Sequence, residues 1–129
     1  MKTLAFWGLL SFLYSCADKV TEVQLTDLSE HNMKIIPEQP SSKDEIKLVV
    51  FDDCTYNVLS GVTKTGNTID IRKQFNGMMK WPCFIKNDTI RIGEIPEGVY
   101  TVNYKLVDTA ITSGDPNVLS FSFKLSVSR

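Results

Sequence analysis

Few side chains in this sequence are suited to acid–base chemistry. His31 is the only histidine, and a Ser–His or Cys–His mechanism would need it buried and oriented by a partner; we predict that it is exposed in a linker. Asp52 and Asp53 have two chemical interpretations: Ca²⁺ ligands together with Asp108 or Asp115, or an acid/base pair for glycoside hydrolysis. Ca²⁺ needs six to eight oxygens and no dense Asp/Asn/Gly loop is visible, so a solvated turn is favoured. The sequence therefore predicts no enzyme, no metal and no cofactor.

Residues 78–82, Met-Met-Lys-Trp-Pro, form the stretch most suggestive of binding. Met78, Met79 and Trp81 fall outside any regular strand pattern, and as an exposed apolar patch they would suit a partner or a sugar ring. The alternative, which is favoured, is that Trp81 closes one end of the domain as part of its core.

Basic residues are concentrated between positions 64 and 91. Six of them stand against two acidic residues there: Lys64, Arg72, Lys73, Lys80, Lys86 and Arg91. They suit an anionic glycan or phospholipid headgroups, but an ordinary solvated surface is favoured. The turn-rich residues 108–117 form a loop, a common place for partner binding, although their composition names no ligand.

The N-terminus has the organisation of an export signal. Lys2 precedes an apolar run at residues 4–14, which is shorter than the roughly 20 residues of a membrane-spanning helix. The run ends in Leu13-Tyr14-Ser15-Cys16, which resembles the lipobox of bacterial lipoproteins.

That resemblance implies a cleaved signal peptide at residues 1–15 and a Cys16 that carries a diacylglycerol thioether and an N-acyl chain such as palmitate. Two or three acyl chains make a stable membrane anchor. Position 17 is Ala rather than the Asp that retains many lipoproteins in the inner membrane, which favours the outer membrane. The alternative is ordinary cleavage near Ala17, with Cys16 discarded or left free.

Export would place Cys54 and Cys83 in an oxidising compartment, where two thiols in a small domain usually pair. Both residues lie at predicted strand ends, so a bridge would hold the segment before Cys83 against the domain. Two separately buried thiols are the alternative.

The composition is that of one globular domain. The chain has 129 residues, 43% of them hydrophobic, and 14 basic against 15 acidic side chains; this balance gives no overall bias toward nucleic acid. Residues 17–45 are acidic, with three lysines and seven acids. We predict a lipidated acidic tether at residues 16–32 and a folded domain at residues 33–129.

Alternation of apolar and polar residues predicts six strands, or seven with residues 33–36. The predicted strands are 33–36, 46–53, 58–63, 68–72, 89–93, 99–106 and 119–127. Residues 64–67 read as a hairpin turn, and residues 71–79 have a helical spacing that permits a single turn. Short strands without intervening helices predict an all-β antiparallel sandwich.

Residues 95–102, Ile-Pro-Glu-Gly-Val-Tyr-Thr-Val, resemble the stretch that leads into the penultimate strand of bacterial immunoglobulin-like domains. The resemblance implies an immunoglobulin-like sandwich in which the Tyr100 ring enters the core and its hydroxyl bonds the backbone at a tyrosine corner.

Together these features predict an envelope-anchored lipoprotein that acts as a non-enzymatic binding module. Its expected partners are the membrane, through Cys16, and an envelope protein or glycan, with no nucleic acid. The alternative is a structural or accessory subunit of a larger surface complex.

Overall fold

The computed structural model describes residues 27–129. The predicted signal peptide, Cys16 and most of the tether lie outside the described residues. Within residues 27–129 no helix is long and apolar enough to cross a membrane.

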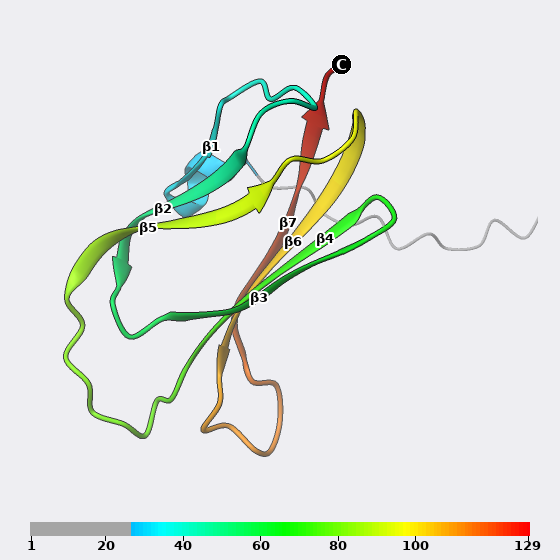
Figure 1. Ribbon diagram of the computed structural model, residues 1–129. Coiled ribbons are helices and arrows are strands. Elements are labelled where there is room, and N and C mark those ends of the chain that lie inside the picture. Colours follow the sequence, from blue (N-terminus) through cyan, green and yellow to red (C-terminus); the bar gives the residue numbers. More distant parts are fainter. Residues whose placement is uncertain (1–26) are drawn as a thin grey trace, which may run out of the picture.

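The described chain folds into two β-sheets that share one core, and all seven predicted strands are present (Figure 1). The three-stranded sheet has the order β1-β2-β5, with β1 Met33–Ile36, β2 Ile46–Cys54 and β5 Ile85–Gly93. The four-stranded sheet has the order β3-β4-β6-β7, with β3 Val58–Thr65, β4 Thr68–Phe75, β6 Gly98–Asp108 and β7 Asn117–Val127. The predicted all-β sandwich is confirmed at this level.

One pair of strands departs from the antiparallel prediction. β4 and β6 run parallel, with Thr68 opposite Thr101 and Phe75 opposite Asp108. After β4 the chain crosses to the other sheet, runs back as β5, and returns beside β4 in the original direction. In the constant-type immunoglobulin order the third strand lies beside the sixth, whereas here β3 occupies the edge of its sheet.

Alternation along β6 and β7 builds much of the core. Tyr100, Val102 and Tyr104 of β6 are buried, and their β7 partners Leu125, Phe123 and Phe121 are buried opposite them. The Tyr100 hydroxyl donates to the carbonyl oxygen of Pro96 at 2.7 Å, which confirms the tyrosine corner. On the other face of β7, Ser120, Lys124 and Ser126 are exposed, whereas Ser122 is buried and its hydroxyl donates to the Asn103 side chain at 2.5 Å.

The turns agree with the sequence pattern. Thr65 pairs with Thr68 at the end of the β3–β4 hairpin, and Gly66 supplies the positive φ of 58° that the tight turn requires. At residues 71–79, where the sequence has a helical spacing, the chain continues as strand β4 up to Phe75. A single turn follows, with the Met79 amide donating to the Asn76 carbonyl.

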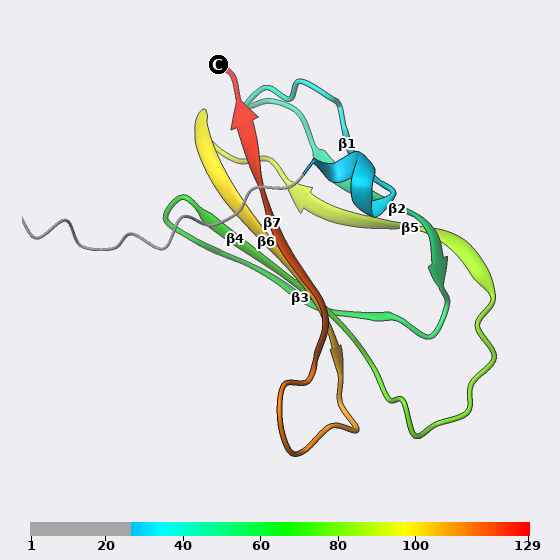
Figure 2. The same cartoon turned by 180° about the vertical axis from the view of Figure 1, so that it is seen from behind.

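The folded domain begins earlier than residue 33. A short 3-10 helix, η1 Leu28–His31, lies beside β1 (Figure 2). It is capped by Asp27, whose carboxylate accepts from the Ser29 amide at 3.0 Å. Leu28 packs on the core, and the His31 ring stacks on Phe121 with centroids 3.8 Å apart. The prediction that His31 is exposed in a linker is therefore wrong, because the Phe121 ring provides an apolar surface on which the imidazole packs.

Candidate binding surface

A disulfide positions the connection between β4 and β5. Cys54 is the last residue of β2 and Cys83 lies just before β5; they are bonded, with Cα atoms 4.9 Å apart. Next to the bridge, the Thr55 amide donates to the Phe84 carbonyl at 3.0 Å. The predicted disulfide is confirmed, and it holds the far end of the 76–84 connection against the three-stranded sheet.

The near end of this connection is held by Asp108. Its carboxylate accepts from the Gly77 amide at 2.9 Å and from the Ala110 amide at 3.0 Å. A Cβ at Gly77 would collide with this carboxylate, so the close approach requires glycine. These two hydrogen bonds join the 76–84 connection to the loop after β6. Both segments lie at the end of the molecule opposite the C-terminus (Figure 1).

Large apolar side chains are exposed along this end of the domain. Trp81 is 63% exposed and Met78 is 81% exposed. The other exposed members of the group are Val58, Leu59, Met79, Phe84 and Ile85. These seven residues are called the apolar end below. The favoured prediction that Trp81 closes the core is wrong, because its side chain is mostly exposed and is not among those that pack on the core.

A cavity of about 420 Å³ opens beside Trp81. Its lining combines aromatic and neutral polar side chains with one aliphatic side chain: Thr55, Tyr56, Val58, Gln74, Phe75, Asn76, Trp81 and Thr109. Two of the polar groups are held in place, since Thr109 donates to the Phe75 carbonyl at 3.1 Å and the Asn76 side chain accepts from the Met78 amide at 3.0 Å. None of these eight described residues carries a formal charge. The set is called the aromatic cavity below.

A group of charged side chains instead lies between the two sheets, around a buried lysine. The side chain of Lys73, on β4, is fully buried and its ammonium group donates to Asp53 of β2 and, at 2.6 Å, to Asp88 of β5. Burial raises the pKa of the Tyr104 phenol above its ordinary value of 10.0, and the carboxylates of Asp53 and Asp88 raise it further. The prediction of a solvated Lys73 is wrong, because the inward alternation of β4 carries it into the core.

The remaining acidic candidates do not converge. Asp52 accepts from the Asn32 side chain at 3.3 Å, and Asp115 accepts from the Asn117 amide at 2.9 Å. Asp53 and Asp108 have the ion-pair and capping partners described above. Among residues 27–129 no three His, Cys, Asp or Glu side chains come together as a metal site.

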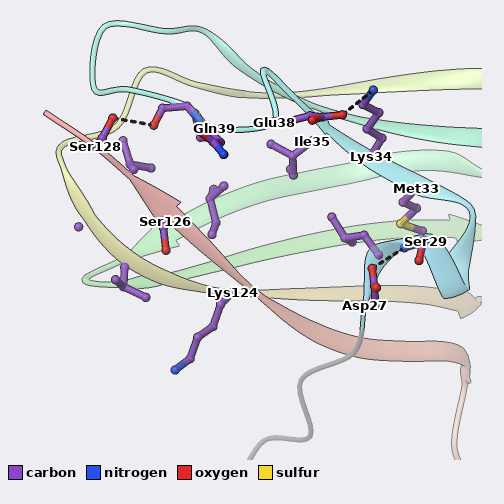
Figure 3. Close-up of a pocket in the computed structure, with 16 residues that line it drawn as sticks. Asp27, Ser29, Met33, Lys34, Ile35, Glu38, Gln39, Lys124, Ser126 and Ser128 are labelled. Carbon is purple, nitrogen blue, oxygen red and sulfur yellow. Dashed lines mark hydrogen bonds and ion pairs between the residues drawn. The ribbon is translucent and has the colours of Figure 1, made fainter.

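A larger groove of about 770 Å³ lies between β1 and β7 (Figure 3). Its lining includes charged side chains, and two of them, Lys34 and Glu38, pair at 2.9 Å, which lowers the pKa of Glu38 below its ordinary value of 4.5. The exposed aromatic side chains gather at the opposite end of the domain, so the apolar end is the better candidate binding surface.

Sequence reasoning found Met78, Met79 and Trp81 and the disulfide that holds one end of their connection. It considered Asp108 only as a Ca²⁺ ligand and missed its role as the second anchor, because that role depends on contact between segments far apart in the sequence. No protein-family model, curated protein or solved structure matches this chain.

Proposed function

We propose that this protein is an exported, lipid-anchored binding module of the bacterial envelope, and that the apolar end is its recognition surface. The observation that carries the proposal is the exposure of Trp81 within a connection held at both ends, by the Cys83 disulfide and by Asp108. Aromatic residues and Met are enriched at binding surfaces, where a fixed position reduces the entropy lost on association.

Export and anchoring rest on separate support. The lipobox-like residues 13–16 motivate a lipid on Cys16, and Ala17 favours the outer membrane. The disulfide indicates an oxidising compartment outside the cytoplasm. Labelled palmitate should enter the wild-type chain in cells and should be absent from Cys16→Ser; equal labelling of both chains would reject the anchor.

The tyrosine corner at Tyr100 supports an immunoglobulin-like ancestry for the domain. The strand order departs from that plan, since β4 rather than β3 lies beside β6 and runs parallel to it. This ancestry carries no function by itself.

Site-directed photocrosslinking in cells tests the recognition surface. A p-benzoylphenylalanine in place of Phe84, which is 65% exposed on the apolar end, should give a discrete adduct with an envelope component. The same group in place of Val99, 54% exposed at the other end of the domain, is the matched control. Adducts of equal yield at both positions, or none at Phe84, would reject the proposal. If the crosslinked partner is a protein that copurifies with this chain in fixed stoichiometry, the chain is an accessory subunit of a larger complex.

A further inference from the structure

We propose that the aromatic cavity binds a neutral saccharide, so that the recognition surface contains a glycan subsite. This inference rests on the proposed binding function and names the ligand class for one part of the surface.

The aromatic residues supply one half of the chemistry. Tyr56, Phe75 and Trp81 all line the cavity. A sugar ring has C–H faces that are nearly apolar, and these pack on the electron-rich face of an aromatic ring. Trp81 reaches the cavity from the connection after β4, so a ring bound beside Tyr56 would also contact the loop that the disulfide holds.

The polar residues supply the other half. Thr55, Gln74, Asn76 and Thr109 offer hydroxyl and amide groups around the same cavity. Side-chain amides both donate and accept, as do the hydroxyls of a sugar, so the two sets of groups can satisfy each other.

Charge and size narrow the ligand class. The eight described lining residues carry no formal charge, so an anionic or cationic ligand would find no counter-charge there. The cavity of about 420 Å³ is within the size range of small-molecule sites. Its openness to solvent beside Trp81 suits a mono- or disaccharide at the end of a longer chain.

Saturation-transfer NMR and calorimetry on the full-length chain test the proposal. The protein is held in a zwitterionic detergent without a sugar headgroup, and the probes are maltose, cellobiose, lactose and N,N′-diacetylchitobiose. We expect at least one disaccharide to receive saturation from the aromatic protons and to bind with a Kd on the order of 1 mM.

Two variants locate the site. Trp81→Ala should weaken binding at least tenfold, while Lys80→Ala, which removes an exposed side chain of the same loop that neither lines the cavity nor belongs to the apolar end, should leave the Kd unchanged. Circular dichroism checks that both variants are folded.

The two proposals fail separately. The saccharide subsite is rejected if no probe binds the folded wild-type chain, or if Lys80→Ala weakens binding as much as Trp81→Ala. If the Phe84 adduct is digested by protease and no saccharide binds, the partner is a protein. The recognition surface then stands and the saccharide subsite is rejected. An adduct sensitive to periodate, together with saccharide binding, supports both.

Discussion

Two nearby regions of the chain invert the usual placement of side chains. Lys73, near the end of β4, is 0% exposed, whereas Trp81, eight positions later, is 63% exposed. Each exception has a local cause: two carboxylates compensate the buried ammonium, and two anchors hold the connection that presents the indole. The comparison teaches that position in the backbone, rather than residue type, decides burial at this end of the domain.

The buried ion group also joins the two sheets. Lys73 belongs to the four-stranded sheet, and Asp53 and Asp88 belong to the three-stranded sheet. A charge in this place requires its partners, because an unpaired buried charge is costly. The apolar end has no such requirement, so its side chains remain available for a ligand.

Removing the buried charge should strongly lower the stability of the domain. Lys73→Ala leaves two carboxylates unpaired, and since Asp88 is 40% exposed and partly solvated, we expect a loss at the lower end of the range for broken buried pairs, about 3 kcal/mol. Urea unfolding measures the loss. Lys105→Ala, which removes an exposed lysine on β6, is the control, with an expected change below about 0.5 kcal/mol. Equal effects of the two variants would mean that the ion group contributes no inter-sheet stability.

Removing the disulfide should also lower the stability of the domain. Cys54→Ser with Cys83→Ser opens a loop of sequence separation 29 and should lower the free energy of unfolding by about 2–4 kcal/mol. Because the connection then keeps only its Asp108 anchor, the cut rate of a protease at residues 76–83 should rise. Reduced wild-type protein should behave like the double variant; an unchanged cut rate would show that Asp108 alone holds the connection.

Much of the fold could be predicted because strand alternation is a local signal. Ile69, Ile71 and Lys73 share the inward face of β4, but the predicted strand ends at residue 72, one residue short of the lysine. The parallel β4–β6 pair could not be predicted, since it depends on which sheet β5 joins. The aromatic cavity was also missed, because it forms where β3, β4 and the loop after β6 meet.

Tyr104 tests the electrostatics of the buried region through pH. Its pKa in the folded protein is raised above 10.0, so the unfolded chain releases the phenolic proton first as pH rises. The protonated phenol of Tyr104 therefore contributes fully to the free energy of unfolding below pH 10, and this contribution is lost as the pH rises above 10. We expect wild type to lose about 1 kcal/mol more than Tyr104→Phe between pH 10 and pH 11, measured by urea unfolding. Parallel curves would show that the phenol does not sense burial or the two carboxylates.

The smallest effect on stability is expected from the largest side chain. Trp81→Ala removes a mostly exposed indole and should change the free energy of unfolding by less than about 0.5 kcal/mol. Ile71→Ala removes a smaller but buried side chain and should cost about 2–5 kcal/mol through the cavity that it leaves. Thermal melting of both variants makes the comparison. A loss above about 1 kcal/mol for Trp81→Ala would mean that the indole closes the core, and the apolar end would then lose the residue on which its binding role depends.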